Sequence, residues 1–382
     1  MDVVLAAGDA PWESAAIREI EDSSTLRLVR RCVDVADLLA IVDTDLAAAA
    51  LVSADLGGLD ADVVHRLERA GVRVAAVESD DARCRSLGIE RGLRLGSLDV
   101  VSHDSPTPRH APHEHRAPLV AVWGPAGAPG RSTVALGLAS AAAAQGIDTV
   151  LVDVDTYGGS QGQALSVLDD VSGLVAACRA ANTGRVTEVV DHLLEIDSDL
   201  RLLTGLPRAD MWPQVRTGAL ELVLGRLRAD AGLLVADVGF SLETGTGPTA
   251  QRNQSTLQVL DQADVIVAVG RPDPVGLARL VRGLHDLSET FPGRVPTLVI
   301  NLARPSLGWH EREVDATLQR LTGLVPTAYL PFDQSGLDLA AVSGRTPREA
   351  APASPFVTRI EVLTRALVSQ IGTPGVLAQA AP

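Results

Sequence analysis

Short apolar runs and stretches with helical spacing alternate along the N-terminal part of the chain. The apolar runs that predict strands lie at 2–8, 25–32, 47–55 and 71–80. Helical patterns separate these runs at 12–22, 35–42 and 60–70. Because alternating strands and helices are typical of parallel α/β folds, we predict a small α/β domain over residues 1–100.

The same alternation resumes after residue 118, with more strands. Apolar, β-branched runs predict strands at 119–123, 148–155, 232–240, 263–270, 296–301 and 326–331. Helical patterns lie at 132–146, 214–230, 251–262, 274–290, 309–322 and 355–371. Since the strands are apolar throughout, helices must cover both faces of their sheet. We predict a doubly wound, mainly parallel α/β domain over residues 119–372, with ligands at the carboxyl ends of its strands.

Between the two predicted domains, residues 101–118 contain four prolines and four histidines and have no apolar period. Proline favours extended backbone, so this segment is predicted to be an interdomain linker. A metal site at His110, His113, Glu114 and His115 is the alternative, but ligands need rigid placement, which favours the linker. The uncharged residues 373–382 are predicted to form a disordered tail.

Composition excludes several classes of protein. The net charge of −15 opposes binding to nucleic acid or to anionic lipid. Cys32, Cys84 and Cys178 are too far apart to form a CxxC pair, which argues for a reducing compartment and against a zinc site. We find no secretory signal pattern and no apolar run long enough to span a bilayer, so we expect a cytoplasmic protein.

The segment GPAGAPGRST at 124–133 lies between a predicted strand and a predicted helix. That context is the one in which backbone N–H groups and a helix N-terminus hold phosphate. The general pattern GxxxxGK[ST] would place glycine at Pro125 and lysine at Arg131. The positions that fit are Gly127, Gly130, Ser132 and Thr133.

All 33 basic residues of the chain are arginine, so no lysine from this chain can meet a phosphate. Arg131 keeps the positive charge, but its side chain is planar and fork-shaped where lysine is a compact point charge. The residues therefore leave open whether this loop binds ATP, whether it hydrolyses ATP, or whether it retains only the fold.

Carboxylates follow two of the predicted strands. Asp153 and Asp155 end the strand at 148–155, and Asp237 lies near the end of 232–240. A single aspartate at such a place is commonly a cap or a loop residue. Three of them at one sheet edge beside a phosphate loop are what magnesium and an attacking water need.

With these residues, segment 119–370 resembles the MinD/ParA family of deviant Walker A (P-loop) ATPases. The family's loop, KGGxGK[ST], falls on 126–132, where Ala126 replaces the signature lysine and Arg131 replaces the loop lysine. The aspartates match the two switches of the family. Asn301 in VINLAR and Pro331 in LPFD resemble the segments that frame the adenine.

The N-terminal pattern resembles a response-regulator receiver domain, without its phosphorelay residues. Asp9 stands alone after the first strand, Ser53 lies near the acceptor place, and Asp55 is displaced. We therefore expect a docking or dimerising module. A degenerate receiver-like domain before such an ATPase resembles the CpaE/TadZ branch, whose members organise Flp/Tad pilus or secretion machinery at the cell pole.

The resemblance implies ATP and Mg²⁺ as cofactors and a nucleotide-dependent homodimer. The implied roles are phosphate binding by Gly127, Gly130, Arg131, Ser132 and Thr133, metal binding by Ser132, Asp153 and Asp237, water orientation by Asp155, and adenine contact by Asn301 and Pro331. Arg131 and Asp155 are the catalytic candidates.

The implied function is a positioning protein for pilus or secretion machinery, recruited by partners to the membrane or the pole. Alternatives are a nucleotide-free pseudo-ATPase scaffold and a septum-site regulator of the same fold. A DNA-partitioning ATPase would want a basic surface, which the net charge opposes. The helical pattern at 355–371 has only Arg359 and Arg365 as basic residues, so we expect it to pack on its own domain and not to anchor a membrane.

Overall fold

The computed structural model describes residues 1–42, 47–89, 92–103, 116–127, 129–167, 171–244 and 252–372. The chain divides into two compact units. The first comprises residues 1–115 with 177–189 and 216–224, and the second comprises 116–176, 190–215 and 225–382. These units interleave along the chain, whereas the predicted domains are contiguous, so the boundaries at 100 and 119 stay a hypothesis.

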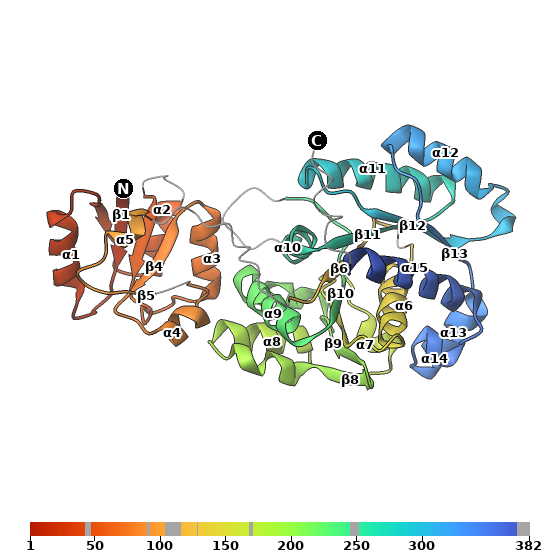
Figure 1. Cartoon of the computed structure of the whole chain (residues 1–382), viewed down its shortest axis with the longest axis horizontal. Helices are drawn as coiled ribbons and strands as arrows, with labels where there is room; N and C mark the ends of the chain where they lie inside the picture. The colour runs from red at the N-terminus through yellow and green to blue at the C-terminus, as the bar shows by residue number, and fades with distance from the viewer. Residues whose placement is uncertain are drawn as a thin grey trace. The chain divides into compact units, whose positions relative to one another are not determined.

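The first unit contains a parallel sheet of five strands in the order β2-β1-β3-β4-β5 (Figure 1). This is the doubly wound order of flavodoxin-like folds. Its strands are β1 (Asp2–Ala6), β2 (Arg27–Arg31), β3 (Ala49–Val52), β4 (Arg73–Val77) and β5 (Gly92–Leu93). Its helices are α1 (Glu13–Asp22), α2 (Val35–Val42), α3 (Ala61–Arg69), α4 (Asp81–Ser86) and α5 (Val100–His103). Val4 and Ala6 of β1 belong to one buried cluster and Val3 and Leu5 to another, so both faces of the sheet are covered.

Both ends of the predicted linker at 101–118 belong to folded parts of the chain. Val101 is buried within α5 because its apolar side chain packs into the core of the first unit. At the other end, the backbone N–H of Ala117 donates to the carbonyl of Arg228 in the second unit. Residues 104–115, with the histidine cluster, and the predicted tail at 373–382 lie outside the described residues.

The second unit contains a sheet of eight strands in the order β13-β12-β11-β6-β10-β7-β9-β8. β8 runs antiparallel to β9, and the other neighbouring strands are parallel. The strands are β6 (Leu119–Trp123), β7 (Thr149–Asp153), β8 (Leu194–Asp197), β9 (Leu200–Leu203), β10 (Leu233–Asp237), β11 (Val265–Gly270), β12 (Thr297–Ala303) and β13 (Ala328–Pro331). The predicted doubly wound, mainly parallel α/β class is confirmed.

The helices that follow residue 116 include several that no sequence pattern predicted, and their residues at 177–189 and 216–224 belong to the first unit. The α-helices are α6 (Arg131–Ala143), α7 (Gln161–Ala164), α8 (Gly173–Asn182), α9 (Thr217–Asp230), α10 (Gln254–Gln262), α11 (Pro274–Thr290), α12 (Glu311–Thr322), α13 (Gln334–Ser343), α14 (Pro347–Ala350) and α15 (Pro355–Ile371). The 3₁₀ helices are η1 (Val186–His192), η2 (Ala209–Gln214) and η3 (Pro305–Leu307). The helix predicted from 214 begins only at Thr217, because Gln214 still belongs to the separate 3₁₀ helix that contains Pro213.

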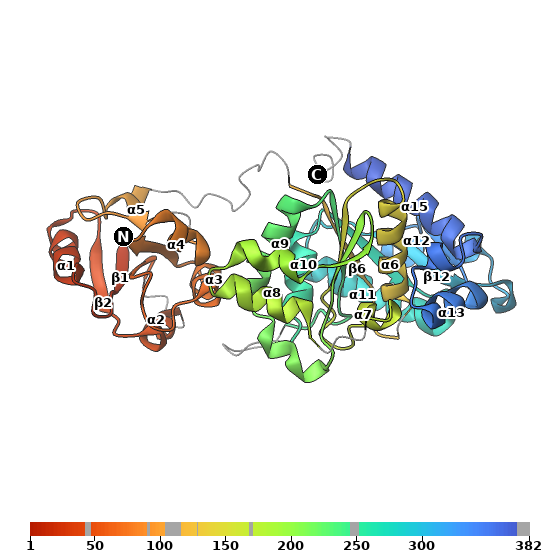
Figure 2. The ribbon, with the colours of Figure 1, turned by 90° about the horizontal axis from the view of Figure 1, so that it is seen from below.

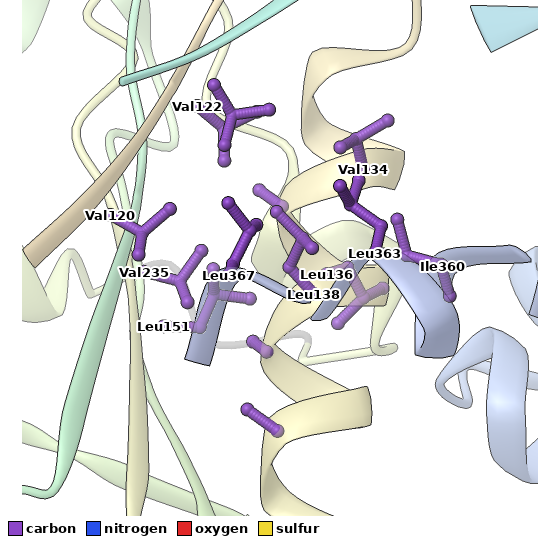
Figure 3. Close-up of a cluster of buried hydrophobic side chains, with 14 of the residues drawn as sticks. Val120, Val122, Val134, Leu136, Leu138, Leu151, Val235, Ile360, Leu363 and Leu367 are labelled. Carbon is purple, nitrogen blue, oxygen red and sulfur yellow. The ribbon is translucent and has the colours of Figure 1, made fainter. Parts of the chain in front are cut away.

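Helix α6 is buried on almost every side between the sheet and α15 (Figure 2). Its small residues allow close approach: a Cβ on Gly137 would lie 3.0 Å from Ile360 and 3.2 Å from Phe356 of α15. Figure 3 shows Ile360, Leu363 and Leu367 of α15 gathered against Val134, Leu136 and Leu138 of α6. Packing on α15 and on the sheet therefore fixes the position of α6, and with it the loop that precedes it.

The start of α15 is fixed by a capping pair. The Ser354 hydroxyl accepts a hydrogen bond from the N–H of Val357 at 3.2 Å and donates to the Asp333 carboxylate. This hydrogen bond holds the pKa of Asp333 below its ordinary value. Asp333 in turn caps α13 by accepting from the N–H of Gly336 at 3.1 Å. The predicted helix at 355–371 is thus part of the core of the second unit.

Among the described residues, none of the helices combines the length and the apolar character that crossing a bilayer requires.

Replacing Leu363 by alanine should leave a cavity between α15 and α6. We expect the free energy of unfolding of the second unit to fall by about 2–5 kcal/mol. Urea denaturation followed by tryptophan fluorescence measures this, since three of the four tryptophans, Trp123, Trp212 and Trp309, lie in that unit. Val362→Ala, at a side chain that is 49% exposed, is the control and should change little. Equal effects of the two substitutions would contradict the packing described.

Candidate functional site

The loop at 124–130 connects the end of β6 to the first turn of α6. Gly130 has φ +85° and immediately precedes the helix, a conformation that favours glycine. A side chain there would also collide with the Asn301 amide, and one on Gly124 would collide with the carbonyl of Val269. The glycines are therefore required by backbone conformation and by close packing. The loop residue Ala128 lies outside the described residues.

Asn301 of β12 braces this loop from the neighbouring part of the sheet. Its side-chain Nδ2 donates to the Pro129 carbonyl at 2.6 Å, and the residue is 1% exposed. Within the described residues its Oδ1 has no hydrogen-bond partner. The register between β12 and β13 shifts between Ile300 and Ala303, and Leu302 has φ +60°. Such a shift at a strand end re-aims the side chains beside it.

Two aspartates lie side by side at the carboxyl edge of the sheet. β7 and β10 are parallel neighbours whose register pairs Asp153 with Asp237, and these side chains are 1% and 0% exposed. Gly159 and Gly205 enclose Asp153, since a Cβ on Gly205 would lie 2.6 Å from its carboxyl carbon. The strand register therefore brings Asp153 and Asp237 together at this edge, as the sequence predicted.

Gln161, which sequence reasoning missed, joins the two carboxylates to the first turn of α6. Its backbone N–H donates to Asp153 at 3.0 Å, while its Nε2 donates to Asp237 at 2.8 Å and to the Ser132 carbonyl at 3.0 Å. It opens the short helix α7, and no spacing in GGSQGQA distinguishes it. Only the folded chain identifies this residue.

Burial raises the pKa of both carboxyls. Desolvation is the largest cause for Asp153, whose pKa is raised well above its ordinary value, and the neighbouring charge of Asp237 adds to it. Desolvation likewise raises the pKa of Asp237 to about 6, against hydrogen bonds from Ser132 and Gln161 and the charge of Arg131. The pair thus retains protons in a pH range where exposed carboxyls have lost them.

Arg131 is turned inward, onto the loop itself. Its Nη1 donates to the Gly124 carbonyl at 3.1 Å, and its Nη2 pairs with Asp155 at 3.4 Å. The two side chains are 10% and 7% exposed. Asp155 also accepts from the N–H of Tyr157 at 2.8 Å. The two residues predicted to be catalytic are therefore partners of each other in this structure.

The carboxyl cluster fits a magnesium ion that a nucleotide helps to hold. Within the described residues, Oδ1 of Asp237 and Oε1 of Gln161 are buried oxygens without a hydrogen-bond partner. No group of three or more His, Cys, Asp or Glu side chains in the described ranges is arranged to hold a metal alone. Mg²⁺ commonly uses one or two carboxylates together with substrate phosphates and water, so this set of oxygens is of the right kind.

The remaining predicted residues are spread more widely. Thr133 lies in the first turn of α6, beside Gly130. Pro331 ends β13 at the edge of the sheet, three strands from β6 in the strand order. The loop, the three aspartates and Asn301 therefore meet at one place, whereas an adenine role for Pro331 stays a prediction.

Replacing Asp237 by asparagine should change how stability depends on pH in the magnesium-free protein. Because its pKa is higher in the folded chain than in the unfolded chain, Asp237 lowers the free energy of unfolding as the pH rises from about 4 to about 6. Asp237→Asn removes this loss. The free energy of unfolding of the variant, relative to that of the unsubstituted protein, should therefore rise by up to ~3 kcal/mol between pH 4 and pH 7.

Thermal melting between pH 4 and pH 7 in EDTA measures this difference. Asp338→Asn, at an exposed carboxylate of the same unit, is the control and should follow the unsubstituted protein. If Asp237→Asn also gives a parallel profile, the raised pKa is wrong.

Comparison with solved structures finds proteins of related architecture. A ParA family ATPase from Chlorobium tepidum TLS aligns with a TM-score of 0.57 and 17% identity over 65% of this chain and 98% of that chain. The septum site-determining protein MinD from Pyrococcus horikoshii OT3, complexed with Mg-ADP, aligns with a TM-score of 0.54 and 16% identity over 67% of this chain and 98% of that chain. The MinC:MinD cell division complex of Aquifex aeolicus aligns with a TM-score of 0.51 and 15% identity over 66% of this chain and 96% of that chain.

No protein-family profile matches the sequence, and no curated protein matches it. At these identities the structural likeness shows the fold alone: the chain has the mainly parallel α/β fold of ParA and MinD P-loop ATPases, together with a second parallel α/β sheet.

Proposed function

We propose that this protein is a MinD/ParA-like positioning protein that binds ATP with Mg²⁺ and dimerises when it does so. One observation carries the proposal: the glycine loop, the start of α6 and three buried aspartates meet at the carboxyl edge of a parallel sheet. In open α/β sheets this edge is where ligands bind.

The loop offers an anion site built from backbone. The first N–H groups of a helix have no intrahelical partners and carry the positive end of its dipole, and here they belong to Arg131, Ser132 and Thr133. Gly127 and Gly130 allow the backbone to approach a phosphate closely. Arg131 adds a positive charge within the same turn.

Ser132 and Asp237 are the groups best placed to hold magnesium, with Asp153 and Gln161 beside them. Magnesium would neutralise phosphate charge and orient the phosphates for in-line attack. Asp155 would orient the attacking water, and for this the ion pair between Arg131 and Asp155 must open. Because arginine matches phosphate well, the phosphates compete with Asp155 for this guanidinium.

The pairing of Arg131 with Asp155 also favours a second function, a pseudo-ATPase scaffold. In this structure the arginine hydrogen-bonds to loop carbonyls and to one carboxylate of the protein itself. Such a scaffold would keep the fold and bind partner proteins through both units without ATP. The two functions differ in whether phosphate displaces the internal partners of Arg131.

For the partner, we propose pilus or secretion machinery of the Flp/Tad type, by resemblance to the CpaE/TadZ branch. A septum-site role is the alternative, since the similar structures include MinD, a septum site-determining protein, and the MinC:MinD cell division complex. In either case we propose a cytoplasmic protein that partners recruit to the membrane or the pole.

Removing the loop arginine should weaken ATP binding. We expect Arg131→Ala to raise the Kd of a fluorescent ATP analogue by about 10- to 100-fold, since it loses a charge-assisted phosphate contact. Arg131→Lys should bind at least as tightly as the unsubstituted protein. Asp155→Ala should still bind but should not hydrolyse ATP. Titration with and without Mg²⁺, with light scattering for the dimer, measures all three.

An exposed ion pair of the same residue types supplies matched controls. Arg208 pairs with Asp210, and their side chains are 74% and 63% exposed. Arg208→Ala and Asp210→Ala should leave binding unchanged. No binding to the unsubstituted protein at millimolar ATP would reject the ATP-binding function and leave the scaffold.

A further inference from the structure

A hollow with a volume of about 90 Å³ opens beside the loop, against the start of α11. Ala126 and Gly127 of the loop line it, together with Gly270, Asp273 and Arg279. The volume is enough for several water molecules, and so for the oxygens of an anion. The hollow lies where the loop lacks a lysine, at Ala126.

The Arg279 guanidinium lies directly against Gly127. A Cβ built on Gly127 would overlap Nη1 of Arg279 and lie 3.2 Å from its Cζ. Gly127 also has φ +103°, so both its conformation and its lack of a side chain admit the arginine. Arg279 comes from the second turn of α11, more than a hundred residues away in sequence, so only the fold brings it to the loop.

Arg279 differs from the other arginines around the loop in having no partner among the described residues. Arg271, in the same hollow, pairs with Asp273 at 2.9 Å, and Asp273 also caps α11 through the N–H of Gly276. Arg131 is engaged by Asp155 and by loop carbonyls. Arg279 is exposed and has no hydrogen bond or ion pair with any other residue that the structure describes. Among the described residues that line the hollow, it is the arginine without an ion-pair partner.

We propose that Arg279 binds a phosphate of the nucleotide held by the loop and supplies the charge that Ala126 lacks. This inference rests on the proposed ATP binding and adds a residue to it. A guanidinium donates two parallel hydrogen bonds to phosphate oxygens, so one free arginine at the mouth of the loop provides both charge and orientation. It requires no rearrangement of the Arg131–Asp155 pair.

Calorimetric titration of the full chain with Mg-ATP, and separately with magnesium tripolyphosphate, tests the inference. Arg279→Gln keeps most of the length of the side chain but removes its charge. It should lower the affinity for both ligands by about 10- to 100-fold. Arg279→Lys should recover most of the affinity. The melting temperature of the unliganded protein should not change, since Arg279 loses no contact with a partner that the structure describes.

Arg282→Gln is the matched control, because Arg282 is an exposed arginine on the same helix whose Nε donates to the Ala278 carbonyl of its own helix. If Arg279→Gln binds both ligands like Arg282→Gln while Arg131→Ala has lost them, ATP binding stands and the role of Arg279 is rejected. If Arg279→Lys is as weak as Arg279→Gln, the charge is not what matters and the proposal falls. If the unsubstituted protein binds neither ligand, both proposals fall.

Discussion

The candidate site depends on the packing of one helix. α6 is buried along nearly its whole length, with the sheet on one side and α15 on another, and Gly137 allows the closest approach. Its axis cannot shift without opening a core that holds the second unit together. The first turn of α6 is therefore held over the ends of β7 and β10, and the glycine loop is held with it. A phosphate loop needs this rigidity, because its donors are backbone groups that must converge on one anion.

The charges of the site follow from that packing. Asp153 and Asp237 are forced together because adjacent parallel strands end in register, and burial makes two negative charges there unfavourable. Gln161 offsets part of this cost with hydrogen bonds to both carboxyls. The arrangement is unfavourable without a cation and suited to one, which is the physical basis for placing magnesium here.

The two arginines beside the loop differ in what they contact. Arg131 faces inward and satisfies the protein's own acceptors, while Arg279 faces an open hollow and has no described partner. A lysine in the loop would place one compact charge where these two arginines now divide the task. If the chain binds a nucleotide as proposed, this division would let it do so without a lysine, and hydrolysis would require the Arg131–Asp155 ion pair to open.

The sequence by itself determined the loop, the aspartates and six of the eight described strands of the second sheet, because apolar strands with polar ends and a glycine turn before a helix are local patterns. It did not predict β8 and β9 at the edge of that sheet. It also placed the three carboxyls at one edge, since parallel strands carry their C-terminal ends to the same side. Gln161, the brace from Asn301 to Pro129 and the approach of Arg279 to Gly127 had no such signal. These contacts join segments distant in sequence through single side chains, so no periodicity encodes them, and only the tertiary packing of the elements decided them.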